Sequence, residues 1–173
     1  MDLAERPTRV DPASIVLRET VRPEDAQVVR DLVASSGFFA PAEVDVAVEL
    51  VQEHLARGPA SGYFFVFAEL HGQTVGYVCY GPIACTVGSY DLYWLAVEQS
   101  LRNCGLGRLL VRACEDRVAK LGGRRVYIET AGRELYKPTQ AFYERCGYKV
   151  EAVLQDFYSP GDPKIIYAKA VAS

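Results

Sequence analysis

The stretch SLRNCGLGRLLVRACEDRV (Ser100–Val118) places two glycines, Gly105 and Gly107, directly before an amphipathic pattern. Apolar residues recur at helical spacing after the glycines, which predicts a helix that begins at this turn. The first N–H groups of a helix have no acceptor within the helix, and the helix dipole favours negative charge there. Glycine also lets another molecule approach the backbone closely. The stretch therefore predicts either a tight turn or a binding site for an anion.

Two common phosphate-binding motifs do not fit the spacing of these glycines. The dinucleotide motif GxGxxG requires a glycine at position 110, where the chain has Leu110. The P-loop requires Gly-Lys-Ser/Thr, which does not follow the turn. The segment from Arg102 to Arg125 nevertheless carries seven Lys/Arg and two acids, a local charge of +5 in a chain of net charge −3. This segment is either an anion-binding surface or an ordinary solvated helix face.

The composition of the chain limits the classes of protein to which it can belong. Its 173 residues, half of them hydrophobic, suit one globular domain, which we place at residues 15–173 after a flexible tail at 1–14. No apolar run approaches the roughly 20 residues that span a bilayer. The negative net charge gives no broad nucleic-acid surface. We therefore expect a cytoplasmic protein that binds neither nucleic acid nor membrane.

The cysteines and histidines indicate neither a disulfide framework nor a metal site. The five cysteines are odd in number and contain no CxxC pair, which is typical of reduced thiols. Two histidines are too few for a His-based metal site. We therefore expect no bound metal.

The pattern of the remaining chain predicts one α/β domain. Helices are expected at 21–37, 41–58, 106–121 and 137–148, and strands at 15–20, 63–70, 74–83, 90–97, 124–130, 149–158 and 164–171. Helical spacing predicts that Val44, Ala47, Val48, Val51 and Leu55 form one buried face, and that Leu106, Leu110, Cys114, Val118 and Leu121 form another.

Two segments together resemble the GNAT family of N-acetyltransferases. The segment YDLYWLAVEQSLRNCGLGRLLV (90–111) resembles the family's central motif Q/R-x-x-G-x-G/A, with Arg102, Gly105 and Gly107 at its fixed positions. The segment AFYERCGY (141–148) resembles the family's second motif. The order of the predicted elements also matches from Ile15 to about Val171. Asn103 and Cys104 depart from the Gly and basic residue that the family often has, which puts one phosphate contact in doubt.

The resemblance implies a fold and a co-substrate. The fold would be a mixed, mostly antiparallel sheet of about seven strands with about four flanking helices. Acetyl-CoA would place its pyrophosphate on the turn, and its pantetheine would pair with the backbone of the strand at 90–97. This strand and the strand at 124–130 would diverge to make room for the pantetheine. The implied cofactor-binding residues are Leu95, Ala96, Val97, Arg102, Asn103, Cys104, Gly105, Leu106, Gly107 and Arg108. Arg108 and Arg112 either contact the phosphates or belong to a solvated helix face.

Acyl transfer to an amine requires a base for the ammonium and an acid for the leaving thiolate. Tyr143 matches the position of the family's tyrosine acid, with a packing role as the alternative. Asp91 and Glu129 match two positions at which family members carry a base, and we favour Glu129. Asp91 shares one strand face with Tyr93, Leu95 and Val97 by the period of two, so it could also face the cofactor side.

The sequence leaves several alternatives for the acceptor amine and for the oligomeric state. We expect a primary amine of a small molecule or peptide, with protein N-terminal acetylation as an alternative and a non-catalytic CoA-binding sensor as an alternative of another class. A homodimer remains open. The turn at 159–163, with Asp156, Asp162 and Tyr158, is expected to be either a charged lip for a cationic amine or a plain hairpin turn.

Overall fold

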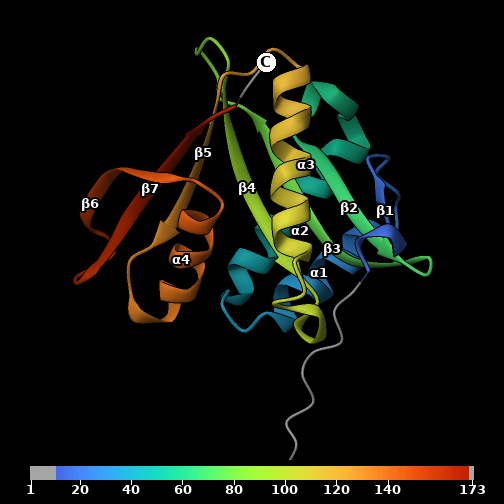
Figure 1. Ribbon diagram of the computed structural model, residues 1–173, viewed down its shortest axis with the longest axis horizontal. Helices are drawn as coiled ribbons and strands as arrows, with labels where there is room; N and C mark the ends of the chain where they lie inside the picture. The colour runs from blue at the N-terminus through green and yellow to red at the C-terminus, as the bar shows by residue number, and fades with distance from the viewer. Residues whose placement is uncertain (1–10, 172–173) are drawn as a thin grey trace, which may run out of the picture. The chain divides into compact units, whose positions relative to one another are not determined.

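The computed structural model describes residues 11–171 of the chain (Figure 1). The helices are α1 (Asp25–Ser35), α2 (Pro41–Arg57), α3 (Leu106–Lys120) and α4 (Lys137–Arg145). Short 3₁₀ turns lie at η1 (Pro12–Ser14), η2 (Gly58–Ser61), η3 (Gln99–Leu101) and η4 (Glu134–Tyr136). The strands are β1 (Ile15–Arg18), β2 (Phe64–Leu70), β3 (Gln73–Pro82), β4 (Ser89–Val97), β5 (Arg125–Ala131), β6 (Lys149–Ser159) and β7 (Asp162–Ala170).

The seven strands form one mixed sheet in the order β1-β2-β3-β4-β5-β7-β6. β4 and β5 run parallel, whereas β1 with β2, β5 with β7 and β6 with β7 run antiparallel. The pairs that join β4 to β5 involve the first three residues of each strand, Ser89–Asp91 and Arg125–Tyr127. The predicted fold class, a mixed and mostly antiparallel sheet with four helices, is confirmed.

The described residues divide into two compact units, and each has its own core. Unit 1 contains residues 11–79 and Trp94–Arg112. The apolar faces of α1 and α2 pack on the strands of this unit because their buried residues recur at helical spacing. This core contains Val29, Leu32, Val33, Val44, Ala47, Val48, Val51, Phe65, Phe67, Tyr77, Cys79 and Ala96. Leu55, predicted to belong to the buried face of α2, is instead 40 % exposed because it lies in the last turn, beyond the sheet-packed part of the helix.

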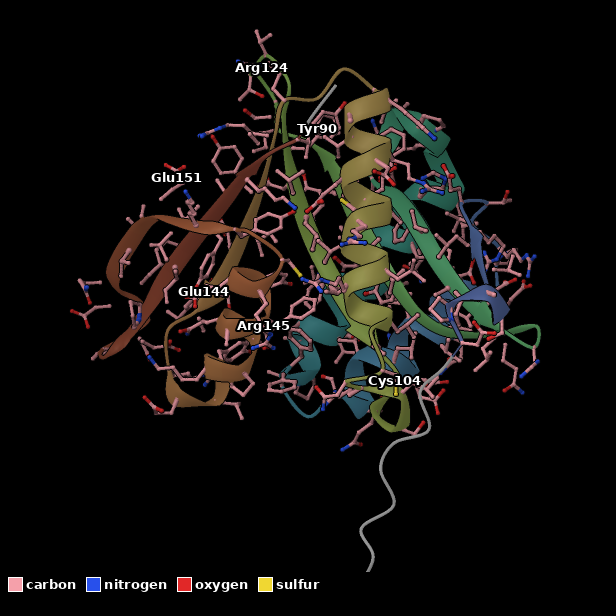
Figure 2. All side chains as sticks on the ribbon, in the orientation of Figure 1. Tyr90, Cys104, Arg124, Glu144, Arg145 and Glu151 are labelled. Carbon is pink, nitrogen blue, oxygen red and sulfur yellow. The ribbon has the colours of Figure 1, made fainter. Side chains whose placement is uncertain are left out.

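Unit 2 contains Tyr80–Tyr93 and the described residues from Ala113 onward. Three tyrosines form its centre: the ring centroid of Tyr143 on α4 lies 6.0 Å from that of Tyr148 and 6.4 Å from that of Tyr167. Lys169 on β7 ties the strand to the helices, since its Nζ lies 2.9 Å from both carboxylate oxygens of Glu115 and donates to the Cys146 carbonyl at 2.9 Å. The Tyr167 hydroxyl donates at 3.3 Å to Glu144, a residue labelled in Figure 2.

The end of α3 differs from the prediction. Leu121 was expected on the buried face, but α3 ends at Lys120 and Leu121 is 53 % exposed. The helix stops because Gly122 takes φ = 79° and Gly123 packs tightly. A Cβ on Gly123 would lie 2.3 Å from Val118 Cγ1 and 2.9 Å from the Tyr90 ring. The sequence correctly predicted that the two glycines end the helix, but the expected apolar face extended one residue beyond the helix itself.

The first described residues form a short turn before β1. Pro12–Ser14 form a 3₁₀ turn whose cap is Asp11, which accepts from the Ala13 amide at 3.0 Å. Residues 1–10 lie outside the described residues, and the flexible tail at 1–14 and the single domain at 15–173 stay predictions.

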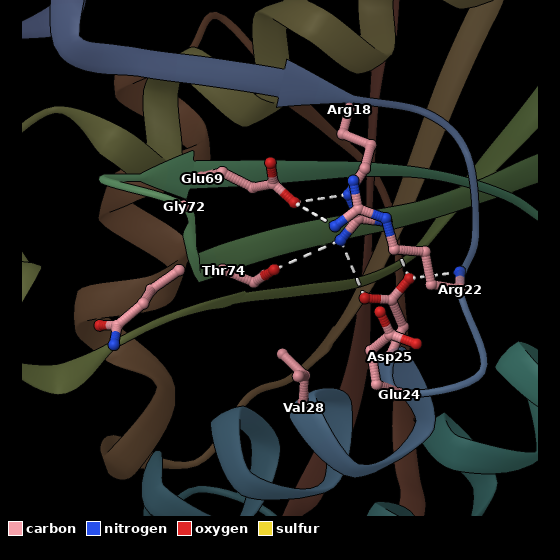
Figure 3. Close-up of a pocket in the computed structure, with 9 residues that line it drawn as sticks. Arg18, Arg22, Glu24, Asp25, Val28, Glu69, Gly72 and Thr74 are labelled. Atoms are coloured by element: carbon pink, nitrogen blue, oxygen red, sulfur yellow. Dashed lines mark hydrogen bonds and ion pairs between the residues drawn. The ribbon is translucent and has the colours of Figure 1, made fainter.

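A buried arginine joins the first elements of unit 1 (Figure 3). Arg18 at the end of β1 bonds both carboxylate oxygens of Asp25 on α1, at 2.8 and 2.9 Å, and Glu69 on β2 at 2.6 Å. Its remaining donors reach the Thr20 carbonyl and the Thr74 hydroxyl, and its guanidinium lies 4.4 Å from the Phe67 centroid. The pocket of about 350 Å³ beside it is thus lined by an arginine whose donors are all used within the protein.

Replacement of Arg18 by Met should destabilise the protein by about 3–5 kcal/mol, because it leaves the carboxylate of Asp25, itself 1 % exposed, without its partner. Urea denaturation of the purified variant measures this loss. Arg30→Met is the matched control, since Arg30 pairs with Asp45 at 2.9 Å on the surface and its loss should cost below about 1 kcal/mol. Equal losses in the two variants would contradict a structural role for the Arg18 network.

Candidate active site

The glycine turn between β4 and α3 has the local geometry that the sequence predicts. After η3, Asn103 takes φ = 63° and Gly105 takes φ = 89°, and α3 begins at Leu106. Asparagine and glycine are the residues that adopt this left-handed region most readily. A Cβ added to Gly105 would meet no atom within 4 Å, so open space lies in front of the backbone at this point.

Backbone N–H groups at the start of α3 are the natural donors of this turn. The Leu109 amide donates to the Gly105 carbonyl at 3.1 Å, so amides before Leu109 have no acceptor in a preceding helical turn. The Arg102 amide differs, since it donates to the Gln99 carbonyl at 3.3 Å. The amides of Leu106 and Gly107 therefore lie between this bonded amide and the first hydrogen bond within α3. The first turn of α3 carries no acid, which leaves the positive end of the helix dipole uncompensated by a carboxylate.

The side chain of Arg102 has a role that the sequence did not predict. Its Nη2 donates to the Ser36 carbonyl at 3.2 Å, and its guanidinium lies 5.3 Å from the Phe38 centroid. Arg102 therefore fastens the α1–α2 loop to the glycine turn within unit 1. No feature of the sequence joins positions 66 residues apart, so only the folded chain reveals this contact. Cys104, labelled in Figure 2, lies in the same turn, with its Sγ 3.6 Å from the Arg102 carbonyl.

The last residues of β4, Leu95, Ala96 and Val97, lead into this turn. Ala96 belongs to the core of unit 1, and its carbonyl would lie 3.0 Å from a Cβ on Gly76. Trp94 packs edge-on against Phe39 of the α1–α2 loop, with ring centroids 4.8 Å apart. The end of β4 is thus held against β3 and this loop. The predicted splay from β5 stays a prediction.

Tyr143 lies at the centre of unit 2 rather than on its surface. Its side chain on α4 is 6 % exposed and touches the rings of Phe142, Tyr148 and Tyr167. Burial, followed by the nearby Cys146 and Cys114, raises the pKa of the Tyr143 hydroxyl well above its usual value. Tyr143 therefore keeps its proton at neutral pH and is a hydrogen-bond donor.

The two candidate bases lie on one face of the sheet in unit 2. Asp91 on β4 is paired with Tyr127 on β5, and Glu129 lies two residues after Tyr127 on the same face. On β7, Lys164 is paired with Ala131, which brings it to this face as well. The Lys164 Nζ lies 2.6 Å from Glu129 Oε2.

Tyr143 approaches the opposite face of this sheet. Its ring contacts Tyr167, which is paired with Ile128 between Tyr127 and Glu129. Successive residues of a strand point to opposite faces, so α4 covers the face away from Asp91 and Glu129. Within unit 2, the candidate acid and the candidate bases are therefore separated by the sheet.

The environments of Asp91 and Glu129 differ. Desolvation, followed by the negative charge of Glu129, raises the pKa of Asp91 to about 6, while Lys164 acts in the opposite direction. Glu129 is 49 % exposed and is held in the ion pair with Lys164, whose side chain is only 13 % exposed. Glu129 is thus engaged by a lysine, whereas Asp91 is partly desolvated.

The β6–β7 turn uses its carboxylates internally. Asp156 takes φ = 54° and accepts from the Gly161 amide at 2.7 Å. Asp162 is 7 % exposed and faces Arg133 at 3.7 Å, because it begins β7 and is paired with Ser159. Of the two alternatives for this turn, the burial of Asp162 favours the plain hairpin turn over a charged lip at this residue. Tyr158 is 49 % exposed, and its ring centroid lies 5.0 Å from that of Phe157.

The part of the chain that the structure describes contains no cluster of possible metal ligands, no disulfide and no helix that could span a membrane. Residues 11–171 contain no group of three or more His, Cys, Asp or Glu side chains arranged to hold a metal ion. None of the five cysteines, all within this range, forms a disulfide. No helix among these residues has the length and apolarity to cross a bilayer.

Comparison with known proteins gives close structural relatives. A crystal structure from Desulfovibrio desulfuricans, assigned to the GNAT family, is 51 % identical with a TM-score of 0.90 and covers 91 % of this chain and 99 % of its own. An aminoglycoside 6′-N-acetyltransferase crystallised with coenzyme A is 24 % identical with a TM-score of 0.73, over 91 % of this chain and 98 % of its own. The second likeness shows the fold alone.

The sequence comparisons agree with the fold. The uncharacterised N-acetyltransferase YvbK of Bacillus subtilis (strain 168) is 25 % identical over 114 residues, which are 66 % of this chain and 68 % of YvbK. The model of the Acetyltransferase (GNAT) family matches residues 28–148, from within α1 to the end of the AFYERCGY segment. These residues include the glycine turn, both candidate bases and Tyr143. The chain is therefore a member of the GNAT family and an acetyltransferase.

Proposed function

We propose that this acetyltransferase transfers the acetyl group of acetyl-CoA to a primary amine of a small molecule or peptide, by direct attack of the amine on the thioester. The observation that carries the proposal is the start of α3, where backbone donors face open space at Gly105 and no acid opposes an anion. A pyrophosphate is an anion of the size that a helix N-terminus binds. The aminoglycoside acetyltransferase of the same fold was crystallised with coenzyme A.

The chain offers a consistent set of residues for acetyl-CoA. The amides of Gly105, Leu106, Gly107 and Arg108 are the donors proposed for the pyrophosphate, with the Arg108 and Arg112 side chains exposed beside them. Asn103 and Cys104 complete the turn, while Arg102 supports it through the α1–α2 loop. Leu95, Ala96 and Val97 are proposed to pair with the pantetheine. Acetyl-CoA supplies the acetyl group as a thioester.

We assign the two proton transfers to opposite faces of the sheet in unit 2. A lysine-like acceptor has a pKa near 10.4 and must lose a proton before its nitrogen can attack. Asp91 is the preferred base, taking this proton directly or through water, because its pKa near 6 leaves it deprotonated at neutral pH yet basic for a carboxylate. Tyr143, protonated on the other face, donates to the leaving sulfur and is reprotonated from solvent.

This assignment changes the preference for Glu129 that the sequence suggested. Lys164 Nζ lies 2.6 Å from Glu129 Oε2, so this carboxylate is already engaged by an ammonium group within the protein. Glu129 therefore becomes the second candidate for the base. A role as a non-catalytic CoA sensor is less well supported, because a sensor does not need a carboxylate of raised pKa such as Asp91.

The acceptor class is proposed from the side chains beside Asp91. Tyr93 on the same strand face is 37 % exposed, and Phe157, whose ring lies 3.9 Å from Lys164 Nζ, is 51 % exposed. These half-exposed rings favour an amine that carries an apolar group, as a peptide N-terminus does. The aminoglycoside acetyltransferase of the same fold keeps a polycationic acceptor as the alternative. Initial rates with peptides, polyamines and aminoglycosides distinguish the two classes, and CoA binding without turnover of any amine would favour the sensor.

Replacement of Gly105 by Val should weaken CoA binding by about 10-fold to 100-fold, since a side chain in the open space would obstruct hydrogen bonds to a charged group. Titration calorimetry with CoA measures the affinity. Gly122→Val is the matched control: Gly122 lies at the other end of α3, has φ = 79° against 89° for Gly105, and also has nothing near its missing Cβ. An equal loss of affinity in both variants, or none in folded Gly105→Val, would overturn the phosphate-binding role.

Replacement of Tyr143 by Phe should lower kcat by a factor of roughly 100 or more, because it removes a positioned acid but keeps the ring in the tyrosine cluster. Single-turnover and steady-state rates with a good acceptor measure the effect, and CoA affinity should stay unchanged. Tyr148→Phe serves as control, since Tyr148 is a neighbouring buried tyrosine in ring contact with Tyr143. A kcat within twofold of wild type in Tyr143→Phe would make Tyr143 a packing residue.

The acid limb of the pH profile of kcat/KM should fall below pH 6. A base must be deprotonated, so activity is full above the Asp91 pKa of about 6 and decreases about tenfold per pH unit below it. Asp91→Asn should lower kcat/KM and remove this limb, while Asp116→Asn, at an exposed site on α3, should leave it in place. A limb near pH 4 in the wild type would contradict the assignment of Asp91.

A further inference from the structure

Asp91, Glu129 and Lys164 form a cluster of two carboxylates and one ammonium group. They come from three adjacent strands, β4, β5 and β7, and lie on the same face of the sheet in unit 2. Lys164 contacts Glu129 at 2.6 Å and leaves Asp91 without an ion pair of its own. The two carboxylates therefore have different surroundings, because the Lys164 ammonium lies against Glu129.

We infer that Lys164 is a positioning residue that reserves Asp91 as the base by holding Glu129 in an ion pair. The inference rests on the proposed transfer to an amine and concerns a residue that touches neither the acetyl group nor the amine. Without Lys164, two carboxylates on neighbouring strands would compete for the same proton, since like charges disfavour the ionised form of each other. With Lys164, the pair Glu129–Lys164 is neutral and Asp91 remains the acceptor.

The geometry holds Lys164 firmly in this role. The register of β5 and β7 pairs Lys164 with Ala131, so its side chain emerges next to that of Glu129. The ammonium also lies 3.9 Å from the Phe157 centroid, a distance typical of a cation–π contact. Only 13 % of the Lys164 side chain is exposed, which limits the screening of its charge by water.

The surroundings of Asp91 in unit 2 determine how its proton affinity responds. Glu129 and Tyr127 face it from β5, Lys164 faces it from β7, and Tyr93 lies on the same face of its own strand. Glu129 raises the pKa of Asp91 and Lys164 lowers it. Loss of Lys164 should therefore raise this pKa, and loss of Glu129 should lower it.

The test is a set of charge-removing variants whose effects have opposite signs. Lys164→Met should move the acid limb of kcat/KM to higher pH by about 0.5 unit or more, and Glu129→Gln should move it to lower pH by a similar amount. The double variant should return close to wild type, and Lys164→Arg should restore the wild-type limb. A purely structural role would lower stability in each variant without moving the limb in opposite directions.

Lys169→Met is the matched control for the loss of a paired lysine from β7. Lys169 is bound to Glu115 at 2.9 Å on the opposite face of the strand, so its removal costs an ion pair without changing the charge that faces Asp91. Its acid limb should match that of wild type. A shift equal to that of Lys164→Met would overturn the inference.

Carbon-13 NMR of the Asp91 carboxyl group separates failure of this inference from failure of the proposed function. It measures the pKa of Asp91 in the protein without any acceptor. Opposite shifts in Lys164→Met and Glu129→Gln support the inference, whereas an unchanged Asp91 pKa in both overturns it even if the enzyme acetylates amines. Shifts seen by NMR with a fixed acid limb would equally overturn it, since Asp91 would then not be the base. If Lys164→Met does not fold, Glu129→Gln and Lys164→Arg decide by the same criteria.

Discussion

The parallel pairing of β4 with β5 is the constraint on which the rest of the structure depends. Antiparallel neighbours can be joined by a short hairpin, but parallel neighbours need a crossover, and here α3 supplies it. A crossover helix must start near the end of the first strand and stop near the start of the second. The N-terminus of α3 is thereby fixed to the end of β4. The place of the proposed anion site follows from the topology, and Gly105 leaves the backbone accessible there.

Local elements and turns, which depend on neighbouring residues, could be predicted from the sequence. Contacts that depend on strand register or on distant segments could not. The turn at Gly105, the helix after it and the succession of helices and strands along the chain follow from glycine placement and apolar periodicity. The limits of that method appear at Leu55 and Leu121, where a periodic pattern continues past the surface that buries it. The burial of Asp162 and the contact of Arg102 with Ser36 depend on how distant segments meet. The pair of Glu129 and Lys164 requires the register of β5 on β7, which no local pattern contains.

The two arginine and lysine networks show how burial separates structural from functional charge. Arg18 is surrounded by acceptors for all of its donors and by the Phe67 ring, so it has no capacity left for a ligand. Breaking such a network destabilises the protein, and its role here is to hold β1 against α1 and β2. The Glu129–Lys164 pair is partly exposed and lies beside a third charge, Asp91. Both members of the pair act on Asp91: Glu129 raises its pKa and Lys164 lowers it.

Two carboxylates on adjacent strands pose a general problem for a proton acceptor. If both remain unpaired, the pair titrates as one coupled system and neither residue is a base of defined strength. A single lysine resolves the problem when it is closer to one acid than to the other, because it stabilises the ionised form of the nearer one. In this chain the proposed lysine comes from a third strand, so its position is fixed by the ladder between β5 and β7. On the proposed assignment, the strength of the base depends on sheet register as much as on the residue that carries the proton.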